Sequence, residues 1–368
     1  MNKKILGGAI TTGVIAVVIA VILSQTPTEV EKALIQKDEK LGLTIFPPTD
    51  TPNLSDLKEA YAQAATAGIG RNNVYLSWPM IEPTQGQYSW KISDALMSLN
   101  KQNDLKVSLY FSIINNRILG PFPNWMGKPD LDQDLQEKTV KVLDEILSRY
   151  NIVDYVIIGG EVDAYFRDHE SDIPKYEEFF TGVYTKLKEK HPGIKFGNSF
   201  SLHGIINHKQ EDLVGKLSQG DFVAFTYTPV NTLNEIDKSP ENAATNLEKI
   251  LDLSGGKKVG LMEISWSTAK SINGTDQGQI EFMKKVYDFY RKNESNFEFL
   301  TWYREYDRSI DSCMRGVNAE PGSINFGNEF VLKNTAEYIC NAGLIDVDKR
   351  PKPAWEEFKK QIQFHPNS

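Results

Sequence analysis

Two glutamates stand where a parallel α/β protein would keep acidic catalytic groups. Glu161 follows an apolar, β-branched run at residues 153–158 and two glycines, and Glu263 lies near the end of a similar run at residues 259–264. Such runs are typical of strands buried on both faces of a parallel sheet. In α/β barrels the active site lies at the carboxyl ends of these strands. Either glutamate alone is better explained by a strand-end salt bridge, so only the pair favours chemistry.

The chemistry that two facing carboxyl groups can perform is retaining glycoside hydrolysis. One carboxylic acid protonates the leaving oxygen, while a carboxylate about 5 Å away attacks the anomeric carbon. Glu161 and Glu263 can form this pair only if the fold brings both strand ends to one mouth.

Eight segments with strand composition alternate with helical segments along the chain. The strands are predicted at residues 41–46, 74–78, 106–112, 153–158, 194–197, 222–227, 259–264 and 297–302. The clearest amphipathic helices are predicted at residues 130–150 and 276–292. Strands that alternate with helices form parallel sheets with crossover helices. We therefore predict an α/β fold, a (β/α)8 TIM barrel, in which the fourth and seventh strands lie on opposite walls.

Composition and the absence of certain motifs argue against several classes of function. The chain has 368 residues and a formal net charge of −8, which argues against binding of nucleic acid. The first strand is not followed by the glycine-rich turn of a dinucleotide-binding fold, and no cofactor is expected. Only five histidines are present, so a metal centre is not expected and a metal-dependent barrel hydrolase is the least favoured reading. A monomer is expected.

The pattern of the first residues predicts a segment that inserts into a membrane. Lys3 and Lys4 precede an uncharged, mostly aliphatic run at residues 5–23 that is long enough to span a bilayer. We expect residues 1–24 to be an uncleaved anchor, with a cleaved secretion signal as the alternative, and residues 25–40 to be a stalk. The barrel, residues 41–368, is then expected at the cell surface, because the lysines stay in the cytoplasm. There Cys313 and Cys340 can form a disulfide; two free buried thiols are the alternative.

Three segments resemble motifs of the clan A glycoside hydrolases. Trp78-Pro-Met-Ile-Glu-Pro-Thr-Gln-Gly-Gln-Tyr-Ser-Trp90 is similar to the loop after the second strand in that clan. Ile158-Gly-Gly-Glu-Val-Asp163 resembles its fourth-strand motif and Met262-Glu-Ile-Ser-Trp-Ser-Thr268 its seventh-strand motif. Among members of the clan, the fourth-strand and seventh-strand motifs loosely resemble those of endo-β-galactanases. The resemblance implies a β-linked glycan as substrate, Glu161 as general acid/base and Glu263 as nucleophile.

The resemblance also implies supporting roles. Tyr227 is the candidate that orients the nucleophile, and Trp302 is the candidate floor of a sugar subsite. His203 and Asp163 are candidate substrate contacts, and Trp78 and Trp266 are candidate platforms for sugar rings. For the aromatic residues the alternative is ordinary core packing, and for His203 it is a place in a surface loop.

Two positions depart from the clan's pattern. Gly160 stands where the clan has an asparagine that contacts the sugar 2-hydroxyl, and Asn73 stands where it has an inward arginine. Arg71 lies two residues earlier on the same strand face and is a candidate substitute. Contacts to the 2-hydroxyl strengthen in the transition state. A non-catalytic carbohydrate-binding protein on the same barrel is therefore the alternative function.

Overall fold

Eight parallel strands close into a barrel. The structure is a computed structural model that describes residues 37–49, 51–319 and 328–364. The strands are β1 (Asp38–Leu43), β2 (Ile69–Tyr75), β3 (Lys106–Asn115), β5 (Val153–Gly160), β6 (Lys195–Ser201), β7 (Phe222–Tyr227), β8 (Lys258–Ile264) and β9 (Phe297–Trp302). Closure results because β2 pairs with both β1 and β3. The predicted (β/α)8 barrel is confirmed.

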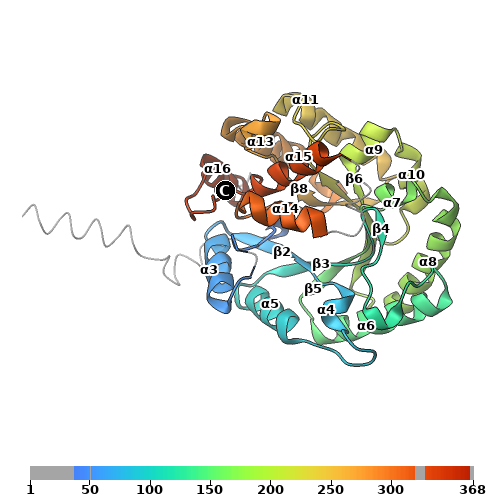
Figure 1. Cartoon of the computed structure of the whole chain (residues 1–368). Helices are drawn as coiled ribbons and strands as arrows, with labels where there is room; N and C mark the ends of the chain where they lie inside the picture. The colour runs from blue at the N-terminus through green and yellow to red at the C-terminus, as the bar shows by residue number, and fades with distance from the viewer. Residues whose placement is uncertain (1–36, 50, 320–327, 365–368) are drawn as a thin grey trace, which may run out of the picture. The chain divides into compact units, whose positions relative to one another are not determined.

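Helices surround the barrel (Figure 1). The outer helices are α3 (Leu54–Ala65), α5 (Lys91–Gln102), α6 (Gln133–Arg149), α8 (Ile173–Lys190), α10 (Glu211–Leu217), α11 (Pro240–Ala244), α12 (Glu248–Leu253), α13 (Asp276–Lys292) and α16 (Pro353–Gln363). Short helices α4 (Trp78–Ile81), α7 (Val162–Phe166) and α9 (Leu202–His208) follow strand ends. Polar side chains cap two of the long helices: Asp132 accepts a hydrogen bond from the Leu135 amide at the start of α6, and Thr275 accepts one from the Gly278 amide at the start of α13.

Apolar packing fills both the barrel and the layer around it. The interior cluster consists of Tyr155, Ile157, Phe222, Ala224, Met262 and Phe299. A much larger cluster lies between the strands and the helices. Strands buried on both faces explain why β5 and β7 consist almost wholly of apolar residues.

The second strand begins five residues earlier than predicted. β2 starts at Ile69 and includes Arg71, Asn72 and Asn73, all of which are buried. These polar residues hid the strand, and each makes hydrogen bonds inside the fold. Asn72 accepts a hydrogen bond from the Ile45 amide, for example, and donates one to the Tyr61 hydroxyl. Buried polar groups of this kind are tolerated when they are paired.

Other boundaries also differ from the prediction. β1 begins at Asp38, so residues 38–40, which were predicted to belong to the stalk, are part of the barrel. The sequence did not predict α9, α14 (Ile310–Ala319) or the two-residue strand β4 (Ile118–Leu119), which pairs antiparallel to β3. The predicted anchor lies outside the described residues. No helix within the described ranges is long and apolar enough to cross a membrane.

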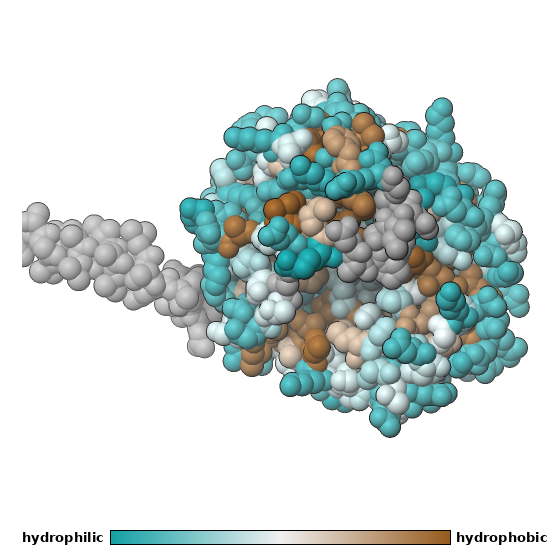
Figure 2. All heavy atoms as spheres, in the orientation of Figure 1, coloured by the Kyte–Doolittle hydropathy of each residue, from teal (hydrophilic) through white to brown (hydrophobic). Residues whose placement is uncertain are grey.

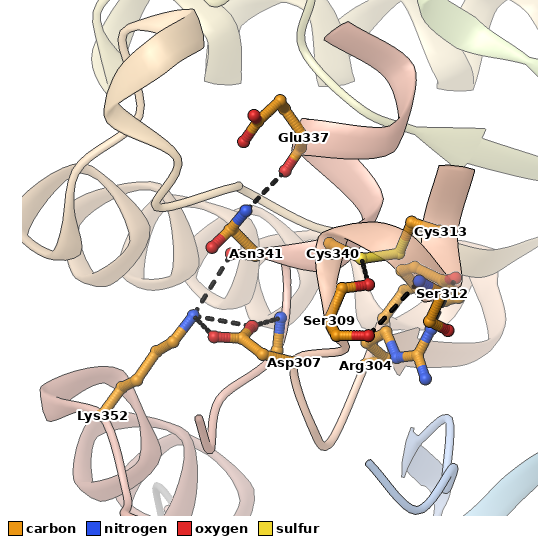
Figure 3. The surroundings of a disulfide bond; sticks show 11 residues. Arg304, Asp307, Ser309, Ser312, Cys313, Glu337, Cys340, Asn341 and Lys352 are labelled. Carbon is orange, nitrogen blue, oxygen red and sulfur yellow. Dashed lines mark hydrogen bonds and ion pairs between the residues drawn. A yellow bond between two sulfur atoms is a disulfide. The ribbon is translucent and has the colours of Figure 1, made fainter. Parts of the chain in front are cut away.

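A disulfide joins the two helices that follow the last strand. Cys313 of α14 and Cys340 of α15 (Glu329–Cys340) are bonded, with their Cα atoms 5.9 Å apart (Figure 3). Nearby, Lys352 Nζ donates to Asp307 at 2.8 Å, and the Gly343 amide donates to the same carboxylate. The predicted disulfide is present, and α14 and α15 pack directly on each other.

Candidate active site

Glu161 stands at the carboxyl end of β5, where the chain turns into α7. Its backbone is left-handed, with φ 47° and ψ 48°, a conformation rare for residues other than glycine. Its amide donates to the Ser199 hydroxyl on the neighbouring strand. Its carboxylate accepts a 2.7 Å hydrogen bond from the Asn116 amide and a 2.5 Å hydrogen bond from the Thr226 hydroxyl. The carboxylate is held by two residues, Asn116 and Thr226, and the side chain stays half-buried.

Glu263 stands near the carboxyl end of β8 and is held from the far side of the barrel. The Tyr75 hydroxyl at the end of β2 donates a hydrogen bond to its Oε1. The pKa of Glu263 is raised to about 7, chiefly by burial and also by the negative charge of Glu161, while the Tyr75 hydrogen bond and the charge of Arg304 oppose the rise. Burial also raises the pKa of Tyr75 well above 10, so its hydroxyl stays a donor.

Thr226 connects the two glutamates. It is the residue of β7 that pairs in register with Glu263, and its hydroxyl donates to Glu161. Both carboxyl groups therefore lie at one end of the barrel, close enough for one charge to act on the other. Two carboxyl groups this close favour a state in which the pair holds a single proton.

Half-exposed aromatic rings lie beside Glu263. Tyr75 has its ring 5.6 Å from that of Phe46 and 5.2 Å from that of Tyr110. Tyr303 follows β9, and the charge of Glu263 raises the pKa of its hydroxyl in addition to the effect of burial. Figure 2 shows one face of the molecule, with hydrophilic residues around most of its edge and several groups of apolar residues inside that edge. Rings in such a position can stack on the apolar face of a sugar.

Tyr227 does not orient the nucleophile, and that prediction was wrong. Its hydroxyl donates to the Ala243 carbonyl and accepts a hydrogen bond from Asn246, both outside the barrel. Successive residues of a strand point to opposite faces. Because Thr226 points inward, Tyr227 points toward the helices. Tyr75 makes the contact to Glu263 instead.

The three predicted tryptophan platforms are core residues. Trp302 is fully buried, with its ring 6.3 Å from that of Phe282 on α13. Trp266 packs on the same phenylalanine ring at 5.2 Å. Trp78 lies under its loop, 5.8 Å from the ring of Phe111. None of the three is more than 3% exposed, so their surfaces are not available to a sugar.

His203 and Asp163 lie behind Glu161. His203 contacts the hydroxyls of Ser201 and Thr228 at the ends of β6 and β7, and burial lowers its pKa to about 4, so it is neutral at pH 7. Asp163 is fully buried and accepts a hydrogen bond from the Ser201 amide. Burial raises its pKa to about 7. This buried aspartate ties α7 to β6, which fixes the turn that carries Glu161.

Arg71 does not take the place of an arginine at the nucleophile. It lies inside the barrel near the amino ends of the strands, where its guanidinium binds both oxygens of Asp154 at 2.8 and 2.9 Å. Its charge also lies over the Tyr155 ring. Asn73 points inward as expected, and its amide donates to the Met262 carbonyl, one residue before Glu263.

The sequence reasoning missed Tyr75, Asn116 and Thr226. Each lies at a strand end or in the loop that follows it, and each binds a glutamate. Asn116 has φ 55°, the left-handed conformation that asparagine tolerates at a hairpin turn. No group of three or more His, Cys, Asp or Glu side chains in the described part of the chain is arranged to hold a metal ion.

Comparison with known proteins finds likeness in structure only. No protein-family model matches the chain, and no curated protein matches its sequence. A family 5, subfamily 18 glycoside hydrolase of Bifidobacterium longum, solved with Manβ1-4GlcNAc, superimposes with a TM-score of 0.64 and 14% identity, over 88% of this chain and 77% of that one. A family 39 glycoside hydrolase of Bacteroides cellulosilyticus gives 0.60 and 17%, over 89% and 64%.

Xylanase 10B of Thermotoga maritima is similar over nearly its whole length. Its TM-score is 0.57 at 14% identity, with 88% of this chain and 94% of that chain covered. At these identities the likeness shows the fold. The chain therefore has the TIM-barrel fold that these glycoside hydrolases share.

Proposed function

We propose that this protein hydrolyses β-glycosidic bonds by a retaining, double-displacement mechanism. The observation that carries the proposal is the pairing of Glu161 and Glu263 at one end of the barrel, linked through Thr226. Both side chains are held by hydrogen bonds and both remain partly accessible.

Each step of the proposed mechanism has a side chain to carry it out. Glu161, as the acid, protonates the leaving oxygen while the Glu263 carboxylate attacks the anomeric carbon, which forms a glycosyl ester and breaks the glycosidic bond. Glu161, now ionised, takes a proton from water, and the resulting hydroxide displaces Glu263 and restores both groups. Tyr75 orients the attacking carboxylate, and Asn116 and Thr226 orient the acid.

The substrate class that we propose is a β-linked oligosaccharide or polysaccharide. Half-exposed rings at the mouth, those of Phe46, Tyr110 and Tyr303, suit the apolar faces of sugars. The Bifidobacterium longum neighbour holds a β1-4-linked disaccharide, which supports a β-glycan as the ligand.

The purified full-length chain should hydrolyse at least one member of a panel of aryl β-glycosides and β-glycans. Proton NMR of the earliest product should show the β anomer, because two inversions at the anomeric carbon give net retention. Initial release of the α anomer would replace this mechanism by an inverting one. No hydrolysis across the panel would contradict the function itself.

The second candidate is a carbohydrate-binding protein without turnover. Gly160 favours it, because the residue before the acid lacks a side chain that could contact a substrate. Glycan-array binding without hydrolysis, unchanged by Glu161→Ala, would select this candidate.

We further propose that the barrel is displayed at the cell surface on an N-terminal anchor, or is secreted. The aliphatic run at residues 5–23 and the Cys313–Cys340 disulfide support this location, since disulfides persist in oxidising compartments. Protease treatment of intact cells should remove the barrel if it is displayed outside.

The pH dependence of hydrolysis is expected to report on Tyr75. Hydrolysis needs a protonated Glu161 and an ionised Glu263, so the pair must hold one proton. Because the pKa of Glu263 is about 7, this proton is lost and kcat/KM should fall as pH increases through about 7. Tyr75→Phe removes a donor that stabilises the ionised form, which raises this pKa. The falling limb should move up by roughly 1–2 pH units, the equivalent of one hydrogen bond to a charged group.

Tyr227→Phe is the matched control for this measurement. It also removes a buried hydroxyl, but one that is bonded outside the barrel. Its pH profile should match that of the wild type. A shift in the Tyr227 variant, or none in the Tyr75 variant, would contradict the assignment of Tyr75 as the positioning residue.

A further inference from the structure

Tyr110 reaches from inside the barrel to the space beside Gly160. Its half-buried side chain packs on the interior cluster and lies 5.2 Å from the Tyr75 ring. Its hydroxyl donates to Asn115 Oδ1 at 2.8 Å, and Asn115 pairs in register with Gly160. The hydroxyl is therefore placed next to the residue that directly precedes Glu161.

The hydroxyl occupies the position where residue 160 would carry a side chain. A Cβ atom on Gly160 would lie 1.6 Å from the Tyr110 oxygen and 2.3 Å from the ring carbon that bears it. Neither distance is sterically allowed, so glycine is the only residue that fits beside Tyr110. The neighbouring Gly159 is constrained in the same way by the Tyr176 hydroxyl.

This position is connected to both carboxyl groups. Gly160 is bonded to Glu161, and the Tyr110 ring contacts Tyr75, whose hydroxyl binds Glu263. When Glu263 attacks, the anomeric carbon must lie between the two glutamates. The anomeric carbon has two ring neighbours, the ring oxygen and C2, and only C2 carries a hydroxyl. The C2 hydroxyl is therefore the ring hydroxyl nearest to the reacting carbon and the group that we expect Tyr110 to contact.

We propose that Tyr110, supported by Asn115, is the specificity-determining residue that binds the sugar hydroxyl at C2. The inference rests on the proposed glycosidase function. A phenol both donates and accepts, so the hydroxyl that donates to Asn115 can accept a hydrogen bond from the sugar. The Asn115 amide nitrogen adds a donor. The loss of a side chain at residue 160 is thus compensated from β3.

The test compares substrates that differ only at C2. Tyr110→Phe should lower kcat/KM roughly 10- to 100-fold on an aryl β-glycoside that the wild type hydrolyses, because a buried polar partner loses its hydrogen bond. On the matching 2-deoxy glycoside the loss should be less than about 3-fold, because no such bond exists there. Tyr227→Phe should leave both rates unchanged. Equal losses on both substrates would overturn the inference but not the hydrolase function.

A binding experiment covers the case in which no substrate is hydrolysed. The probes are 1-deoxynojirimycin-type iminosugars of the gluco, manno and galacto series, which carry the C2 hydroxyl, and isofagomine-type iminosugars, which lack it. The gluco and manno series share one isofagomine, because they differ only at C2, and the galacto series has its own. Calorimetry should show that Tyr110→Phe weakens only the first type. Selective weakening of the first type in a protein that hydrolyses nothing would overturn the proposed function and keep the inference. Equal weakening of both types would overturn the inference. If the wild type binds neither type, the proposed function and the inference are both overturned.

An exchange of side chains provides a second variant. Gly160→Asn alone should abolish hydrolysis, because its side chain collides with Tyr110. Tyr110→Ala alone should lose at least as much activity as Tyr110→Phe. The double variant Tyr110→Ala/Gly160→Asn should regain at least about 10-fold over Tyr110→Ala on the C2-hydroxyl substrate only, the size of one restored hydrogen bond. No recovery in a folded double variant would overturn the inference.

Discussion

Glu263→Gln is expected to abolish hydrolysis while the fold persists. Glutamine has the same shape and can still accept the Tyr75 hydrogen bond, but its amide cannot form the glycosyl ester. Removal of one member of a covalent catalytic unit costs roughly 10⁴-fold or more in kcat. The measurement is the initial rate on an aryl β-glycoside that the wild type cleaves, with thermal unfolding of both proteins as the test of folding.

Glu178→Gln is the matched control, because this glutamate is exposed on the outer helix α8 and lies outside the site. A 2-deoxy-2-fluoro glycoside with a good leaving group should label the wild type, and peptide mapping should locate the label on Glu263. A fully active Glu263→Gln variant, or a label on another residue, would exclude Glu263 as the nucleophile.

Glu161→Ala is expected to lower the rate in a way that depends on the leaving group. A sugar or methylumbelliferyl leaving group needs a proton, so the rate should fall by roughly 10²–10⁴-fold, the usual contribution of a general acid. A dinitrophenyl leaving group needs none, so bond cleavage should be much less affected. The glycosyl ester should then accumulate, since Glu161 also activates water.

Added azide is expected to rescue this variant. The small anion can enter the space left by the side chain and attack the ester, and it needs no general base. The product should be the β-glycosyl azide. Equal losses for both leaving groups, or no azide product, would contradict the acid/base role. Glu161→Gln, which keeps the volume between Asn116 and Thr226, should show the same leaving-group dependence.

The fold and the two glutamates could be predicted because their signals are local. Apolar β-branched runs mark strands buried on both faces, and Asp132 and Thr275 mark helix starts. Glu161 and Glu263 each interrupt an apolar pattern at a strand end. The barrel then follows from the repeated alternation of strands and helices, because parallel strands require crossover connections.

The residues that hold the two glutamates could not be predicted. A strand that is buried on both faces shows no alternation of polar and apolar residues along the sequence. In β7 both Thr226 and Tyr227 are buried, so the sequence does not show which one points into the barrel. The register with Glu263 decides it, and register depends on pairing with β8. Trp302 was mistaken for a sugar platform for the same reason, whereas the next residue, Tyr303, is half-exposed.

Polar residues inside the barrel were hidden for a different reason. Arg71 and Asn73 contradict the apolar pattern of a buried strand, and they are tolerated only because distant residues satisfy them. Those partners lie on β5 and β8, far away in the sequence. Side-chain pairing across a closed barrel is a property of the assembled structure, and no local pattern reports it.

The disulfide between α14 and α15 makes folding depend on the redox potential of the surroundings. Cys313 and Cys340 are separated by 27 residues, and closing a loop of this length removes unfolded-state entropy worth about 3.5 kcal/mol. Whole domains are stable by only about 5–15 kcal/mol. A reducing cytosol would withhold this contribution, so a bacterial host that exports the chain to an oxidising periplasm is better suited to its production than one that keeps it inside.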